Sequence, residues 1–164
     1  MPRRPRSAVL VLAAVPLLAA ALACGFSEQQ TQRVQTEIEE LLAAYLPALG
    51  EFYRTGDPAT VEGLVAPRER ERVEALIRGR AQEGLVIDAT LQRFEIDRFD
   101  LYQHSNALLT TREVWDLRIR AAGSDRVIQD EPGKSDRYRY QVKRGDDGRW
   151  IVLSREVVAP PAGG

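Results

Sequence analysis

The hydrophobic period of the chain changes at Leu85, and this change restricts the fold more than any other feature of the sequence. Before Leu85, apolar residues recur every three or four positions, which is the period of an amphipathic helix. After Leu85, apolar and polar residues alternate, as they do in a strand with one buried face. A run of helices followed by a run of strands favours an α+β domain, with the helices packed on one face of a curved antiparallel sheet.

The helical part predicts a long first helix, from about residue 28 to residue 54. Ser27 and Gln30 have the spacing of a capping box at its start. Pro47 lies inside the pattern and either kinks or splits the helix, because proline lacks a backbone donor and crowds the preceding turn. We expect a kink, since the apolar stripe continues on both sides of Pro47.

Two further helices are predicted before the change of period. Asp57 as N-cap and Pro58 in the first turn predict a short helix that ends near Ala66. Pro67 begins the next helix, and Gly84 terminates it. The sequence thus predicts three helices ahead of the sheet.

The strand part begins with residues 85–103, whose apolar residues change parity between Leu91 and Phe94, so it is either one long strand with a bulge or two bent strands. Residues 107–121 form a half-buried strand, with Trp115 on its apolar face. Residues 122–136 are expected to be a loop. Two strands at residues 137–144 and 149–158, joined by the Gly145–Gly148 turn, close the domain.

The amino terminus has the layout of an export signal. Three arginines precede Val9–Leu18, an apolar segment of h-region length. The uncharged run from Ser7 to Ser27 comes close to the roughly 20 residues that a membrane-spanning helix needs, so an uncleaved anchor is the alternative. Pro16 and the small residues ahead of Cys24 favour cleavage.

The segment Ala21-Leu22-Ala23-Cys24 resembles the lipobox of bacterial lipoproteins, although that family has leucine and a small residue where this chain has Ala21 and Leu22. The resemblance implies a lipoprotein signal peptide at residues 1–23 and acyl chains on Cys24. Residues 24–27 would then be the lipidated amino terminus and a short tether. Two or three acyl chains hold a protein firmly to a bilayer. The same three residues before Cys24 also form an A-x-A site, which would release a soluble secreted protein.

The closing hairpin YRYQVKRGDDGRWIVLSREV, together with helices followed by long bent strands, resembles the nuclear transport factor two-like (SnoaL-like) fold. The plastid-division intermembrane-space domain is a similar example. The resemblance covers residues 28–158, leaving residues 159–164 as a disordered tail. It implies a cone-like sheet with a concave mouth, and it implies that an isomerase or dehydratase would use an acid or a His–Asp pair in an apolar pocket.

Candidate catalytic residues are few. His104 lies in a predicted turn, where an exposed imidazole is the ordinary outcome, and Asp97 and Asp100 lie in a strand where either can face water. No serine has the surroundings of a nucleophile elbow, and no phosphate-binding glycine loop or metal-spaced cluster is present, so no cofactor or metal is predicted. Five aromatic residues either line a ligand pocket or form the core face of the sheet: Tyr102, Trp115, Tyr138, Tyr140 and Trp150.

Composition excludes several kinds of partner and site. After Ala23 the chain has 20 basic and 24 acidic side chains, a net charge of -4 that disfavours binding to nucleic acid. A single cysteine and a single histidine cannot form a disulfide or a Cys/His metal site.

The sequence therefore predicts a protein of the bacterial cell envelope, anchored to the membrane through Cys24 and facing the periplasm or exterior. It is expected to bind an envelope protein or a small apolar ligand without chemistry. The alternatives are a secreted or tethered isomerase or dehydratase, and a structural module of an envelope complex.

Overall fold

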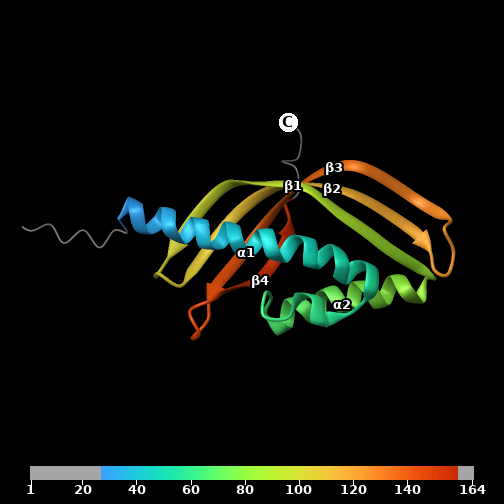
Figure 1. Ribbon diagram of the computed structural model, residues 1–164, viewed down its shortest axis with the longest axis horizontal. Helices are drawn as coiled ribbons and strands as arrows, with labels where there is room; N and C mark the ends of the chain where they lie inside the picture. Colours follow the sequence, from blue (N-terminus) through green and yellow to red (C-terminus); the bar gives the residue numbers. More distant parts are fainter. Residues whose placement is uncertain (1–26, 159–164) are drawn as a thin grey trace, which may run out of the picture.

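The computed structural model describes residues 27–158. The predicted signal peptide (residues 1–23), the lipidated Cys24 and the tail (residues 159–164) lie outside the described residues. Figure 1 shows two helices on the concave side of a strongly curved sheet, which confirms the α+β prediction. The elements in chain order are α1 (Glu28–Thr55), the 3₁₀ helix η1 (Pro58–Val61), α2 (Pro67–Gln82), β1 (Leu85–Tyr102), β2 (Asn106–Ala121), β3 (Val127–Arg144) and β4 (Trp150–Val157).

The sheet is an antiparallel meander in the order β1-β2-β3-β4. The core lies between its concave face and the apolar stripe of α1. No helix in residues 27–158 combines the length and the hydropathy that crossing a bilayer requires.

Helix α1 begins and ends where its capping residues predict. The Ser27 side chain accepts a hydrogen bond from the Gln30 backbone N–H at 3.2 Å. At the other end, Gly56 adopts a φ of 73°, which glycine tolerates best, and its N–H donates to the carbonyl of Phe52 at 2.8 Å. Pro47 lies within one continuous helix of 28 residues, so the split alternative is wrong.

The predicted second helix is shorter than expected. It is the four-residue 3₁₀ helix η1, and it ends at Val61 rather than near Ala66. The reason is a tertiary contact: the Val152 N–H donates to the Leu64 carbonyl at 2.9 Å, and the Ala66 N–H donates to the Val152 carbonyl at 2.8 Å. The chain turns after η1, and Val65 then pairs with Val152, so this segment covers part of the open edge of β4.

Strand β1 is a single strand with bulges, which confirms the first of the two alternatives for residues 85–103. Its pairing with β2 shifts register between Leu91 and Arg93 and again between Ile96 and Arg98. Each bulge restores apolar side chains to the concave face, where Phe94 and later apolar residues of β1 pack on the core.

The loop predicted at residues 122–136 is wrong over most of its length. Strand β3 starts at Val127, and the turn before it is correspondingly short. The first, charged part of β3 is paired with β2. In this pairing Asp130 lies opposite Arg118, and their side chains form an ion pair at 3.1 Å. Asp116 also accepts a hydrogen bond from the Gly133 N–H at 2.8 Å. Polar side chains on both faces conceal this strand from a pattern that relies on alternating hydrophobicity.

Helix α1 approaches β1 so closely that only glycine fits at position 50. A Cβ atom built on Gly50 would lie 2.4 Å from the backbone carbonyl oxygen of Ala89. This contact fixes the distance between the second half of α1 and the sheet.

Candidate functional site

A groove opens between α2, the end of α1, and β3 and β4. Two adjoining cavities of ≈ 1180 Å³ and ≈ 470 Å³ share the residues that line it. Leu76 and Val157 are 42% and 63% exposed, which is unusual for large apolar side chains. We define the groove by the five residues common to both cavities: Tyr53, Leu76, Tyr138, Arg155 and Val157.

Arg155 is the only cation among these five groove residues, and it is 8% exposed. Its Nε donates to the Tyr140 hydroxyl at 2.8 Å, and its Nη2 donates to Glu113 at 2.6 Å. The guanidinium lies 3.5 Å from the centre of the Tyr138 ring, in cation–π contact. A guanidinium carries five N–H groups, and these two hydrogen bonds use two of them.

Glu113 holds Arg155 in place and is fully buried. Its Oε1 accepts from the Thr111 hydroxyl at 2.9 Å and from the Tyr140 hydroxyl. Its Oε2 accepts from the Trp115 indole N–H at 2.8 Å and from Arg155 at 2.6 Å. A carboxylate has about four acceptor positions, and all of them are occupied. Glu113 therefore orients Arg155 and has no lone pair with which to accept a proton from a ligand.

The sequence analysis missed both members of this ion pair. Glu113 has the same parity along β2 as Trp115, the residue used to assign the apolar face. The position of a charged residue, Glu113, on the apolar face of this strand was therefore the sequence feature that could have identified the buried pair. Arg155 had a weaker signal, because the register shift between β3 and β4 changes the parity of β4 after Val152.

Burial keeps the phenols around Arg155 neutral. Desolvation raises the pKa of Tyr53, Tyr138 and Tyr140 above the ordinary value, and the attraction of Arg155 only partly opposes this. Burial lowers the pKa of Arg155, but the attraction of its neighbours, Glu113 among them, outweighs this and raises it above the ordinary value. Around Arg155 the groove thus presents one ion pair, Arg155 with Glu113, surrounded by neutral phenols.

Tyr45 lies behind the groove and has a buried hydroxyl without a hydrogen-bond partner within residues 27–158. We expect Tyr45→Phe to raise the free energy of unfolding by about 1 kcal/mol, because it removes an unsatisfied polar group. Tyr140→Phe is the matched comparison, since it removes one hydroxyl that bonds both Glu113 and Arg155. It should lower the free energy of unfolding by about 2 kcal/mol. Urea unfolding measures both, and a loss of stability in Tyr45→Phe would contradict the assignment.

A second ion pair, with a buried carboxylate and a half-exposed arginine, forms the α2 side of the groove. Glu69 is 3% exposed and accepts two hydrogen bonds from Arg72, at 2.8 Å and 2.6 Å. Arg72 also donates to the backbone carbonyl of Arg155 at 3.2 Å. This contact links α2 to β4 and holds the two walls of the groove together.

The five aromatic residues predicted to bind ligand lie in three places. Trp115, Tyr138 and Tyr140 surround Arg155, and Trp115 and Tyr138 line the smaller cavity. Trp150 packs elsewhere in the core, where its indole N–H donates to Glu37 at 3.1 Å. Tyr102 is 47% exposed at the end of β1. Ligand binding by these residues stays a prediction.

The three candidate catalytic residues are not in the groove. His104 lies in the β1–β2 turn with its Nδ1 3.2 Å from Nε2 of Gln30. The Asp97 carboxylate is paired with two arginines of the neighbouring strands, at 2.8 Å and 3.5 Å. Asp100 accepts from Arg98 at 2.6 Å. Within residues 27–158 no cluster of side chains is suited to hold a metal ion.

Comparison with known proteins gives a likeness in structure alone. No family model matches the chain, and no curated protein matches it. The intermembrane space region of the chloroplast protein ARC6 is similar with a TM-score of 0.65 and 16% identity, covering 76% of this chain and 96% of that one. An NTF2-like superfamily protein from Salmonella enterica has a TM-score of 0.55 and 15% identity, covering 82% and 96%. A periplasmic fragment of TraM has a TM-score of 0.51 and 9% identity, covering 77% and 98%.

Identities this low carry information on the fold only. Within it, the groove lies between the concave face of the sheet and α2, and the buried Glu113–Arg155 pair lies at its wall. The chain therefore has the α+β nuclear transport factor 2-like fold, with two helices packed on a curved four-stranded antiparallel sheet.

Proposed function

We propose that this chain is an extracytoplasmic binding protein, held to a membrane through acyl chains on Cys24, whose groove takes a small ligand with an apolar body and an oxygen acceptor. The observation that carries the proposal is Arg155, a buried cation at the groove whose hydrogen bonds to Tyr140 and Glu113 use two of its five N–H groups. Glu113 keeps the Arg155 guanidinium in one orientation, so this cation is already ordered before a ligand binds.

The walls of the groove support an apolar body for the ligand. Leu76 from α2 and Val157 from β4 are exposed, and both line the two cavities. The rings of Tyr53 and Tyr138 add two partly buried surfaces. A ligand that covered these side chains would gain free energy in proportion to the apolar area removed from water, while the acceptor at Arg155 would set its orientation.

Two observations support the anchor and the location. The amino terminus has the residue pattern of an export signal, and it ends in a lipobox-like segment at Cys24. Two of the similar structures are described as a periplasmic fragment and as an intermembrane space region, which are both extracytoplasmic.

Acyl labelling tests the anchor. Cells that express the full chain and are fed a radioactive or clickable palmitate should label the wild-type protein, whereas Cys24→Ala should remain unlabelled because its side chain has no sulfur. Ser27→Ala is the control, since it alters the neighbouring tether and retains Cys24. Equal labelling of the wild type and Cys24→Ala, or none in either, would overturn the anchor.

A fluorescent probe tests the groove. 1-Anilinonaphthalene-8-sulfonate has an apolar ring system and an anionic group, so it should bind the wild-type chain with increased emission. Leu76→Glu should weaken this binding at least fivefold, because it places a charge on the apolar wall. Ile128→Glu is the matched control: Ile128 is 48% exposed, close to the 42% of Leu76, but it lies in β3 near the β2–β3 turn. Equal effects of the two changes would contradict binding in the groove.

The acceptor is tested by competition at the same site. Dodecanoate should displace the probe at concentrations at least fivefold below those of dodecyltrimethylammonium, because only the carboxylate can accept from Arg155. Equal displacement by the two surfactants would remove Arg155 from the proposal and leave only an apolar groove.

A further inference from the structure

We propose that the domain contacts anionic phospholipid through one end of its sheet, which presents Arg98, Tyr102, Arg139 and Lys143. We call these four residues the basic end. This inference rests on the proposed acylation of Cys24 and adds to it a defined orientation on the membrane and a surface that recognises the lipid.

The covalent distance from the anchor is short. Only two residues, Gly25 and Phe26, lie between Cys24 and Ser27, the N-cap of α1. Because an extended residue spans at most about 3.6 Å, the Cα atom of Ser27 cannot lie more than about 11 Å from the Cα atom of Cys24, whose sulfur would carry an acyl group. The first turn of α1 is therefore held near the lipid headgroups.

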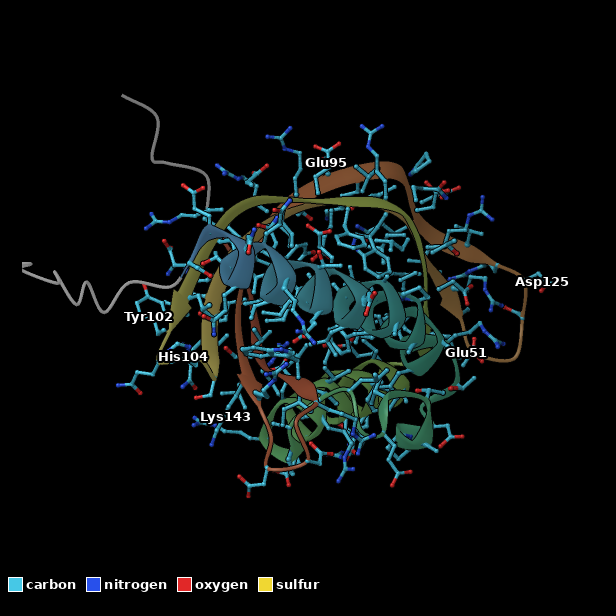
Figure 2. The ribbon with its side chains drawn as sticks, turned by 60° about the vertical axis from the view of Figure 1, so that its left-hand side comes forward. Glu51, Glu95, Tyr102, His104, Asp125 and Lys143 are labelled. Atoms are coloured by element: carbon cyan, nitrogen blue, oxygen red, sulfur yellow. The ribbon has the colours of Figure 1, made fainter. Side chains whose placement is uncertain are left out.

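The basic end lies beside this first turn. Nε2 of Gln30, in the first turn of α1, is 3.2 Å from Nδ1 of His104 in the β1–β2 turn. The same turn is joined to β3, because the backbone N–H of Arg144 donates to the carbonyl of Ser105 at 2.8 Å. Figure 2 shows Tyr102, His104 and Lys143 grouped at the end of the molecule where α1 begins, with Asp125 at the opposite end.

The chemistry of the basic end suits an anionic bilayer surface. Tyr102 is 47% exposed, and tyrosine favours the membrane interface because its ring is apolar and its hydroxyl is polar. Arg139 and Lys143 lie on the same, outer face of β3 and are exposed. Arg98 is paired with Asp100. Basic side chains close to a membrane are attracted to acidic lipids over about one Debye length.

A small hollow adjoins Tyr102. It has a volume of ≈ 220 Å³, and its polar lining consists of Arg98, Arg139, Thr110, Tyr102 and Asp100, whose carboxylate is paired with Arg98. Arginine and hydroxyl groups are suitable donors to the oxygens of a phosphate. The hollow therefore provides a place for the phosphodiester of a lipid headgroup.

Depth-dependent quenching tests the orientation on the full, acylated chain. The protein is reconstituted in vesicles of phosphatidylcholine and phosphatidylglycerol at a ratio of seven to three. Acylated Cys24 has no free thiol, so a thiol-reactive NBD dye labels only the cysteine introduced by Tyr102→Cys or by Asp125→Cys. A headgroup nitroxide lipid should quench the dye at position 102 at least threefold more than the dye at position 125. Equal quenching overturns the inference.

Charge reversal tests the partner. Lys143→Glu should reduce quenching of the dye at position 102 at least twofold, whereas Arg126→Glu, an exposed reversal in the β2–β3 turn, should leave it unchanged. Equal effects would remove anionic lipid as the partner. Flotation separates this inference from the proposed function: a chain that does not float with the vesicles refutes the anchor, while a chain that floats without differential quenching refutes the orientation alone.

Discussion

Glu113→Gln is expected to lower the free energy of unfolding by about 3–5 kcal/mol, because it leaves the Arg155 guanidinium buried without a compensating charge. Glu113 is fully buried and Arg155 is 8% exposed, so water cannot replace the lost carboxylate. In the wild type, Glu113 accepts hydrogen bonds from four side chains: Thr111, Trp115, Tyr140 and Arg155. The NH₂ group of glutamine would point one of its own donors at these donors, so at least one hydrogen bond is lost. Urea unfolding at neutral pH, followed by far-ultraviolet circular dichroism, measures the loss.

Asp97→Asn is the matched control for this prediction. Asp97 also pairs with two arginines, Arg112 and Arg137, but these lie on the outer face of the sheet and are 52% and 55% exposed. Exposed ion pairs contribute little, so the loss should stay below about 1 kcal/mol. Similar losses in the free energy of unfolding for Asp97→Asn and Glu113→Gln would show that burial does not increase the contribution of the Glu113–Arg155 pair to stability.

A double-mutant cycle then isolates the pair itself. Arg155→Met removes the cation and keeps an apolar side chain of similar length, so Glu113→Gln should cost less in that background than in the wild type. The difference reports the coupling between the two side chains. Additive losses would mean that Glu113 stabilises the fold through Thr111, Trp115 and Tyr140 alone.

Gly50→Ala is expected to lower the free energy of unfolding by about 2 kcal/mol or more. The new Cβ would lie 2.4 Å from the Ala89 carbonyl oxygen, and because that oxygen belongs to the backbone it cannot rotate away. Helix α1 or strand β1 must shift, and forced shifts of this kind cost about 1–3 kcal/mol. Alanine favours a helix by about 0.5–1 kcal/mol over glycine, so the clash must also exceed that gain.

Gly79→Ala separates the clash from helix propensity. Gly79 lies in α2, and a Cβ built there meets no atom within 4 Å. The change should therefore raise the free energy of unfolding by about 0.5–1 kcal/mol. Thermal unfolding of the two variants side by side gives the comparison. A gain in stability from Gly50→Ala would disprove the close approach of α1 to β1.

Features that depend on neighbouring residues were predicted well from the sequence. The cap at Ser27, the terminating glycines and the change of period at Leu85 all report local geometry or the burial of one face. The last hairpin belongs to the same class, because its turn residues specify its connection. The start of β3 was missed, since Val127–Asp136 is held by cross-strand ion pairs and backbone bonds rather than by an apolar face.

The candidate site was predicted less well. Trp115, Tyr138 and Tyr140 were selected as aromatic residues of an alternating sheet, and the structure places them around Arg155. Neither Arg155 nor Glu113 was selected, although they carry the only buried ion pair that joins β2 to β4 among the described residues. A charged residue is expected to be solvent-exposed when only the sequence is known. Its buried partner lies on another strand, so the sequence around it gives no indication of the pair.

The sequence by itself determined the order of helices and strands and the α+β class, and it predicts an export signal ahead of Cys24. These follow from periodicity, capping and composition, which are properties of short segments. Only the tertiary structure decided which strand faces joined, where the groove opened and how Glu113 met Arg155 across 42 positions of sequence. The physical reason is that a buried charge is tolerated only when it is paired. The partners come from segments that are distant in the sequence, so no local sequence pattern can predict the pair.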